Sequence, residues 1–319
     1  MTLTPNHFAA GFARLEANIE RAIKGKPEVV RLALTCLLAE GHLLIEDVPG
    51  VGKTSLARAI AASIDASWHR IQFTPDLLPS DVTGVTIWNQ ATQEFGFHPG
   101  GIFANLVVAD EINRASPKTQ SALLEVMEEN RVTVDSIAHP VPRPFMVIAT
   151  QNPIDMDGTY ALPEAQLDRF LIRATVGYPD LAAEMSILST QRKGEVVDQL
   201  EPVMSAAEVS RLIDAAAEVY VSDPVQEYLI RVVSGTRATP GIRLGCSPRA
   251  SLALLRASRA WAAAQGRVFV TPEDVQDLAV SVLAHRILPS PEAELQGRTQ
   301  AQLVEQVLRS VAVPQQLAG

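Results

Sequence analysis

The sequence contains little cysteine, few aromatic residues and less positive than negative charge. Cys36 and Cys246 are its only cysteines and show no Cys-x-x-Cys spacing, which excludes a disulfide scaffold and predicts reduced thiols. Lysine and arginine total 27 against 36 acidic residues, a net charge of −9 in 319 residues. Because nucleic acid is a polyanion, this acidic balance argues against broad binding to it, and we expect no nucleic-acid partner.

Long apolar runs are also missing. No run approaches the roughly 20 residues needed to cross a bilayer, so we expect no membrane span. The first residues lack the basic and apolar segments of a signal peptide, and we expect a cytoplasmic protein. Only a short helical segment precedes Gly25, so no separate N-terminal recognition domain is expected.

One glycine-bearing turn between an apolar strand and a helix is the strongest positive signal. Strand 43–46 is followed by a turn and the start of a helix with the sequence Asp47-Val48-Pro49-Gly50-Val51-Gly52-Lys53-Thr54-Ser55. This pattern predicts a phosphate-binding loop, in which backbone N–H groups and the helix N-terminus face a triphosphate. Lys53 would reach the β- and γ-phosphates and the Thr54 hydroxyl would hold Mg²⁺. The alternative is a plain strand–turn–helix with a surface lysine.

Asp47 departs from the usual loop pattern, which has glycine at that place. Pro49-Gly50 must then make the turn, and Asp47 either caps the loop or tolerates its geometry.

Polar residues follow two further strands. The apolar run Ile102–Ala109 predicts a buried strand that ends at Asp110 and Glu111, and strand 145–150 is followed by Asn152. Ligands of open α/β sheets bind at the carboxyl ends of such strands. Asp110 would hold Mg²⁺, Glu111 would be the base that activates water, and Asn152 would contact that water and the γ-phosphate.

The alternation of strands and helices predicts an α/β fold, a parallel sheet flanked by helices. Between the main strands we expect a short helix and hairpin within 75–98 and a second hairpin over 131–142. Leu162–Arg169 should be a short helix and Phe170–Val176 the last strand. After Pro179 strand signals stop, which predicts an all-α second domain. We therefore divide the chain into a nucleotide-binding domain (1–178) and a helical lid (179–319), with helices expected at 181–191, 206–219, 224–234, 248–265 and 272–285.

Together these stretches resemble the MoxR-type ATPases of the AAA+ superfamily. The resemblance covers about residues 25–285 and is carried by Ile45–Thr54, Ile102–Ala115, Ala149–Pro153, Gly158–Phe170 and, more weakly, Ser247–Leu252. Asp47 is a common variant in that group. The resemblance implies that the chain is an ATPase that uses ATP and Mg²⁺, with Arg169 as the arginine finger for a neighbouring subunit and Arg249 as the second sensor.

The resemblance also implies a homo-oligomeric, hexameric ring whose two hairpins point toward the central pore. Its relatives act as chaperones that remodel or mature partner proteins, often with a von Willebrand factor A domain, and help insert metal cofactors. The alternatives are a magnesium-chelatase-like motor subunit, a helicase-like nucleic-acid motor and a non-catalytic scaffold. The hairpin around Asp135 has no basic cluster or aromatic platform for nucleic acid, and the intact Lys53, Glu111 and Asn152 disfavour a scaffold.

Overall fold

The computed structural model describes residues 5–48, 50–152, 159–179, 181–182, 184–185 and 196–314. The α-helices are α1 Pro5–Ala22, α2 Pro27–Leu38, α3 Lys53–Ala62, α4 Pro79–Thr83, α5 Pro117–Glu129, α6 Glu164–Leu167, α8 Ala206–Ala217, α9 Asp223–Ala238, α10 Pro248–Ala264, α11 Pro272–Leu283, α12 Pro291–Leu295 and α13 Gln300–Ser310. The short 3-10 helices are η1 Ile112–Arg114, η3 Val196–Gln199 and η4 Ala284–Arg286. The strands are β1 Leu43–Glu46, β2 Ile64–Asp65, β3 Trp68–Gln72, β4 Gly84–Asn89, β5 Glu94–Pro99, β6 Leu106–Asp110, β7 Arg131–Val134, β8 Ile137–Pro140, β9 Met146–Gln151, β10 Ile172–Ala174, β11 Met204–Ser205, β12 Ile242–Leu244 and β13 Leu288–Pro289.

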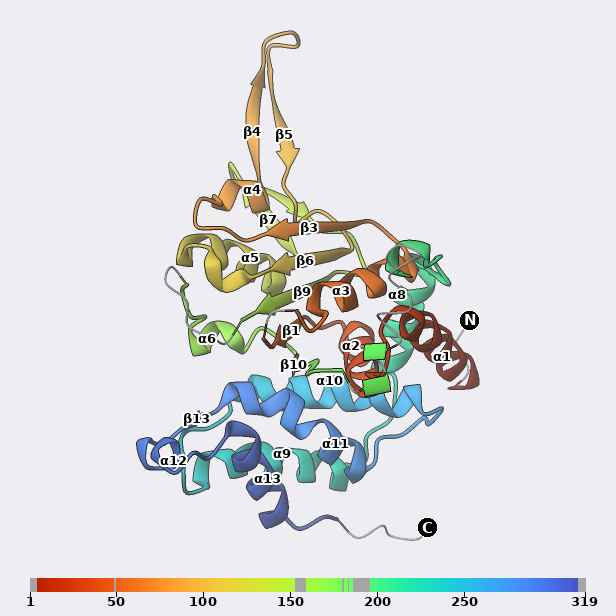
Figure 1. The fold of residues 1–319 in the computed structure, drawn as a ribbon, viewed down its shortest axis with the longest axis vertical. Coiled ribbons are helices and arrows are strands. Elements are labelled where there is room, and N and C mark those ends of the chain that lie inside the picture. The colour runs from red at the N-terminus through yellow and green to blue at the C-terminus, as the bar shows by residue number, and fades with distance from the viewer. Residues whose placement is uncertain are drawn as a thin grey trace.

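A five-stranded parallel sheet in the order β10-β1-β9-β6-β3 forms the centre of the nucleotide-binding part (Figure 1). Successive side chains of a strand point to opposite faces, and β1 shows this clearly. Leu43 and Ile45 join a core with α1, α2 and α3, whereas Leu44 joins a second core with α5. Both faces are therefore covered, and the predicted α/β fold is confirmed.

The predicted strand at Ile102–Ala109 begins later than expected. β6 starts at Leu106, and the preceding residues form a turn in which Phe103 N–H donates to Gly100 O and Ile102 N–H donates to Val82 O. Ile102 and Ala104 are nevertheless fully buried. The apolar run correctly indicated burial, but burial alone does not require pairing in a sheet. The last strand, β10, is likewise shorter than the predicted 170–176.

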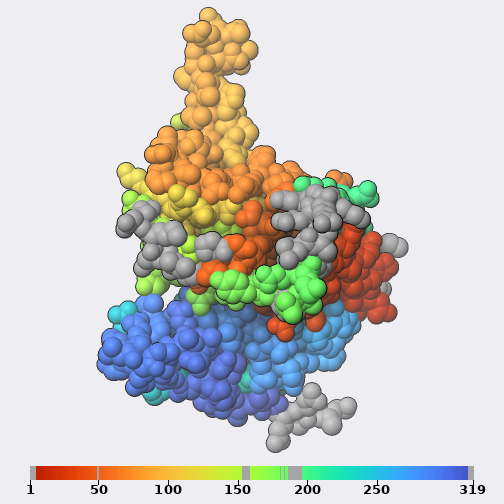
Figure 2. All heavy atoms as spheres, viewed as in Figure 1, coloured from red at the N-terminus to blue at the C-terminus, as the bar shows by residue number. Residues whose placement is uncertain are grey.

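The hairpin expected within 75–98 is present as β4 and β5 and projects from the body of the molecule (Figures 1 and 2). Its apolar side chains are unusually accessible: Ile87 is 48% exposed, Trp88 47% and Phe95 71%. The Trp88 and Phe95 rings meet edge to face at 4.9 Å between centroids. The second hairpin, predicted over 131–142, is present and pairs β7 with β8.

Helices dominate the C-terminal part, and the helices predicted near α8, α9, α10 and α11 are found. The expectation that strands stop after Pro179 is wrong in detail, since β11 pairs with β2 and β12 pairs with β13. The predicted helix 181–191 lies largely outside the described residues. The domain boundary at 178/179 stays a prediction. None of the helices in the described ranges combines the length and the apolar character that crossing a membrane requires.

The helical part packs closely on the sheet-bearing part. α10 contacts α1, α2 and α8 on one side and α9 and α11 on the other (Figure 1). One buried core joins Ile45 of β1 and Leu37 of α2 to Leu254 of α10 and Leu278 of α11. This shared core fixes the helical part against the edge of the nucleotide-binding part.

Candidate nucleotide-binding site

A cavity of about 410 Å³ opens at the carboxyl ends of the parallel strands. Its lining includes eight predicted site residues: Gly50, Gly52, Lys53, Thr54, Ser55, Asp110, Glu111 and Asn152. Three further lining residues, Arg70, Gln72 and Thr150, were not predicted. The structure thus brings residues from four separate chain segments to one volume.

The loop between β1 and α3 leaves its backbone open to the cavity. Gly50 and Gly52 have φ angles of +85° and +91°, which favour glycine, and beyond their immediate chain neighbours no heavy atom lies within 4 Å of where a Cβ would stand. Lys53 is the first residue of α3, so its backbone N–H lies at the positive end of the helix dipole. Lys53 Nζ donates to Asp47 O and, at 3.0 Å, to Gln151 O. Pro49, a predicted loop residue, lies outside the described residues.

Three other predicted loop residues do not line the cavity: Asp47, Val48 and Val51. Asp47 caps the loop instead. Its Oδ1 accepts from Val48 N–H at 2.7 Å and its Oδ2 accepts from Gly177 N–H at 2.5 Å, which ties the loop to the chain after β10. Val51 packs against the buried core. Asp47 therefore supports the loop through its side-chain carboxylate, which accepts from two backbone N–H groups, and the sequence-based alternative of a cap is the one observed.

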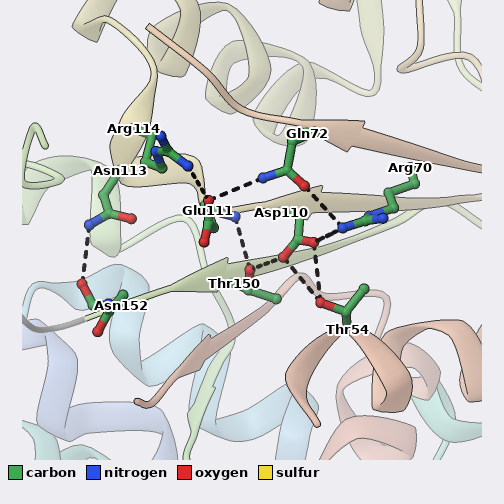
Figure 3. A network of polar contacts seen from close by, with 9 residues as sticks. All are labelled: Thr54, Arg70, Gln72, Asp110, Glu111, Asn113, Arg114, Thr150 and Asn152. Atoms are coloured by element: carbon green, nitrogen blue, oxygen red, sulfur yellow. Dashed lines mark hydrogen bonds and ion pairs between the residues drawn. The ribbon is translucent and has the colours of Figure 1, made fainter. Parts of the chain in front are cut away.

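Asp110 is the most heavily hydrogen-bonded side chain of the site (Figure 3). Its Oδ1 accepts from Thr150 Oγ1 at 2.6 Å and from Thr54 Oγ1 at 3.3 Å. Its Oδ2 accepts from Arg70 Nη2 at 2.5 Å and Nε at 3.2 Å, and from Thr54 Oγ1 at 3.2 Å. Burial raises the pKa of Asp110, but the hydrogen bonds from Thr150 and Arg70 outweigh it and the pKa lies below its ordinary value. The carboxylate is therefore held ionised.

Glu111 follows directly and has left-handed backbone angles, φ 54° and ψ 52°. Its N–H donates to Thr150 Oγ1 at 2.9 Å. Its Oε2 accepts from Gln72 Nε2 at 3.2 Å and from Arg114 Nη1 at 2.9 Å (Figure 3). Glu111 is thus fixed at the backbone by one strand and at the carboxylate by two other segments.

Asn152 reaches the same cavity from the end of β9. Its backbone carbonyl oxygen accepts from Asn113 Nδ2 at 3.1 Å, which links η1 to the chain after β9 (Figure 3). Asn113 therefore supports the position of Asn152.

Sequence reasoning missed Arg70, Gln72 and Thr150 although each had a signal. Arg70 and Gln72 stand two positions apart on β3, so both side chains point to one side of the sheet. The register sets Gln72 opposite Asp110. Thr150 is the last residue of the predicted strand 145–150, two positions before Asn152.

Arg169 and Arg249 do not line the cavity of their own chain. Both instead pair with Glu128 near the end of α5: Arg169 Nη2 lies 3.1 Å from Oε2 and Arg249 Nη2 lies 2.9 Å from Oε1. Arg249 remains 67% exposed at its side chain. The two arginines, from different parts of the chain, are therefore neighbours, and their predicted roles on a nucleotide stay predictions.

A buried arginine fixes the segment before the predicted finger. Arg286 is 3% exposed at its side chain, and its Nε donates to Asp168 Oδ1 at 2.7 Å. Its Nη2 also donates to Phe170 O at 2.7 Å. Asp168 and Phe170 flank Arg169, so the helical part holds both neighbours of that residue.

The residues present fit a nucleotide with Mg²⁺. Gly50 and Gly52 leave open space where any other residue would place a Cβ, beside the N-terminus of α3. Thr54 and Asp110 offer the hydroxyl and carboxylate oxygens that Mg²⁺ prefers. The cavity volume also lies within the range usual for small-ligand sites.

Comparison with known proteins identifies the family of the chain. Residues 42–172 match the ATPase family associated with various cellular activities (AAA), and residues 234–307 match the AAA lid domain. The chain is 50% identical to the uncharacterized protein YeaC of Bacillus subtilis, covering 94% of this chain and 93% of that one. It is 40% identical to Chaperone MoxR1 of Mycobacterium tuberculosis, covering 93% and 81% respectively. A crystal structure of a protein from Cytophaga hutchinsonii superposes with a TM-score of 0.90 at 34% identity, covering 98% of this chain and 97% of that one.

Proposed function

The chain belongs to the MoxR family of AAA ATPases, and we propose that it binds ATP with Mg²⁺ and hydrolyses it to ADP and phosphate. The observation that carries this proposal is the convergence of Lys53, Thr54, Asp110, Glu111 and Asn152 on one cavity at the carboxyl edge of the sheet. Such convergence is what phosphoryl transfer needs, because its catalysis consists mainly of positioning and charge stabilisation.

Each residue has a distinct task in this proposal. Lys53 binds the β- and γ-phosphates, and the loop N–H groups and α3 bind the remaining negative charge. Thr54 and Asp110 would hold Mg²⁺, and a bound Mg²⁺ would supply positive charge to the phosphate oxygens. Glu111 accepts the proton of the attacking water, and Asn152 orients that water.

Two substitutions separate binding from hydrolysis. Glu111→Gln should still bind Mg-ATP but hydrolyse it very slowly, because the phosphate loop and Asp110 remain. Lys53→Ala should weaken binding itself, since the phosphates lose their direct cationic partner. Binding is measured by fluorescence titration with a labelled ATP and turnover by phosphate release. Turnover of the Glu111→Gln variant at the wild-type rate would show that Glu111 is not the base.

We further propose that the chain works as a hexameric ring in which Arg169 acts on the nucleotide of the neighbouring subunit. The position of Arg169 supports this, because the residue lies outside its own cavity and beside Arg249. An arginine finger supplied in trans contributes about 10³–10⁵ in rate. Arg169→Ala should therefore bind ATP nearly normally yet hydrolyse it poorly.

Mixing two inactive variants tests the trans assignment. Lys53→Ala lacks the phosphate contact and Arg169→Ala lacks the finger, but a mixed ring can place an intact Lys53 site against an intact Arg169. Activity should partly return on mixing. If mixed oligomers are shown to form by native mass spectrometry and no activity returns, Arg169 acts within its own subunit or not at all.

The ring would serve as a chaperone that remodels or matures partner proteins, among them proteins with a von Willebrand factor A domain and complexes that receive metal cofactors. The relative named Chaperone MoxR1 supports this role. The β4–β5 hairpin supplies an exposed apolar surface for a client through Ile87, Trp88 and Phe95. A pulldown with the Glu111→Gln variant tests the idea, and recovery of nucleic acid in place of protein would contradict it.

A further inference from the structure

Hydrogen-bond donors occupy every acceptor position of the Asp110 carboxylate. A carboxylate offers about four lone-pair sites. Thr150 Oγ1 takes one on Oδ1, the single hydroxyl proton of Thr54 is shared between both oxygens, and Arg70 donates twice to Oδ2 through Nε and Nη2 (Figure 3). A cation that binds this carboxylate, directly or through its water shell, must therefore displace one of these donors.

The three donors differ in how readily they can leave. Thr150 is fully buried and also accepts from Glu111 N–H, so its departure would break two bonds inside the core. Thr54 belongs with the carboxylate in the proposed metal site and need not leave it. Arg70 stands on β3, the edge strand of the sheet, and its side chain is 48% exposed. Arg70 is the one that can move into solvent without disturbing the core.

Charge points to the same residue. A guanidinium and a divalent cation repel each other when both approach the same carboxylate. The hydroxyl groups of Thr54 and Thr150 are neutral and carry no such repulsion. Arg70 also has a second acceptor, since its Nη2 donates to Gln72 Oε1 at 3.0 Å.

We propose that Arg70 is a counter-ion that competes with the nucleotide's Mg²⁺ for Asp110, so that metal binding requires the Arg70 side chain to leave Oδ2. This inference rests on the proposed function of the site. It makes Arg70 a residue that sets the apparent metal affinity without being a metal ligand. The metal can bind only those molecules in which Arg70 has left the carboxylate. Its apparent dissociation constant is therefore the intrinsic one divided by the fraction of such molecules.

The experiment measures metal binding without turnover. The full-length chain is saturated with a non-hydrolysable ATP analogue and titrated with Mn²⁺, and free Mn²⁺ is followed by electron paramagnetic resonance. For a half-exposed ion pair, Arg70→Gln should lower the Mn²⁺ dissociation constant about fivefold. An unchanged or raised dissociation constant would overturn the proposal.

Arg114→Gln is the matched control. Arg114 is 50% exposed and pairs with Glu111 rather than Asp110, so its removal deletes an equal charge near the cavity without freeing the Asp110 carboxylate. Competition predicts tightening in Arg70→Gln and little change in Arg114→Gln. Equal tightening in both variants would mean a general charge effect and would also overturn the proposal.

A second titration separates competition from direct phosphate binding. With EDTA present, the affinity for the analogue should be the same in wild type and in Arg70→Gln. A loss of affinity there would make Arg70 a phosphate ligand and contradict the proposal. If the wild-type chain binds neither analogue nor Mn²⁺, the proposed function itself fails. If it binds both and Arg70→Gln shows no tightening, only the role of Arg70 fails.

Discussion

The Thr150 hydroxyl joins the two acidic residues of the site, and its removal is a sharp test of the site's architecture. Thr150 Oγ1 donates to Asp110 Oδ1 at 2.6 Å and accepts from Glu111 N–H at 2.9 Å, and the residue is fully buried. Valine keeps the β-branched shape and nearly the same volume. Thr150→Val therefore removes two hydrogen bonds near the carboxyl end of β9 without opening a cavity.

The expected cost follows from these two bonds. A hydrogen bond to a charged group contributes about 1.5–3 kcal/mol, and a buried donor left without its acceptor costs about 1–3 kcal/mol. Asp110 keeps its bonds from Thr54 and Arg70, so the lower parts of both ranges apply. We expect the free energy of unfolding to fall by about 3 kcal/mol.

Activity should fall as well. Glu111 has left-handed backbone angles, which persist only where the surroundings hold them. Without the Thr150 acceptor, Glu111 should shift from its position. A misplacement that costs about 1.4–2.8 kcal/mol in the transition state lowers turnover about 10- to 100-fold.

Thr150→Ser provides the control because it keeps the hydroxyl and loses one methyl group. Its cost should be about 1 kcal/mol, within the range for removing a buried methyl. Urea unfolding followed by tryptophan fluorescence reports stability, and phosphate release reports turnover. Equal stability and equal turnover of the Val and Ser variants would refute the assigned role of the hydroxyl.

Three further predictions concern other parts of the molecule. Burial lowers the pKa of His42 from 6.5 to about 4, so the unfolded chain takes up the proton first. The free energy of unfolding should then fall as the pH drops from 6.5 to 4, by up to about 1.4 kcal/mol per pH unit. In His42→Gln, the plot of urea midpoint against pH should be flatter over this range. Arg286→Met should lower the free energy of unfolding, measured in urea, by about 3 kcal/mol because Asp168 and Phe170 O lose a buried hydrogen-bond donor. The control Arg231→Met breaks an exposed pair with Glu227 and should lower it by less than about 1 kcal/mol. Single-stranded DNA or RNA should not stimulate turnover at physiological salt, given the net charge of −9; several-fold activation with a steep salt dependence would contradict this.

The sequence was most informative where the determinants are local. The phosphate loop could be predicted because Gly50, Gly52, Lys53 and Thr54 stand within five consecutive positions between a strand and a helix. Asp110 could be predicted because a buried parallel strand is a continuous apolar run, and the first acidic residue after that run marks its carboxyl end. Glycine's tolerance of positive φ and the apolar run of a buried strand are both properties of a single segment, so each can be recognised from that segment alone.

Contacts across the sheet could not be predicted in the same way. Arg70 reaches Asp110 only because β3 lies beside β6 with Gln72 opposite Asp110. That register depends on the packing of both strands in the finished sheet. The turn at Ile102 was missed for a related reason, since hydrophobicity reports burial and not hydrogen-bond pairing.

The same limit applies between the two parts of the chain. The pairing of Arg169 and Arg249 with Glu128 depends on how the helical part docks. Neither arginine carries a local signal for that carboxylate. Asp168 and Arg286 are 118 positions apart in the chain, yet they form a buried pair.

The core shared by the sheet and the helical part determines how the chain can be divided. Leu37 and Ile45 belong to the same buried cluster as Leu254 and Leu278, so cutting the chain before α9 would strip the cover from an apolar face. We therefore expect the helical part and the sheet-bearing part to unfold together as one cooperative unit. Calorimetry of the full chain should accordingly record a single melting transition, and a fragment that ends before α9 should aggregate.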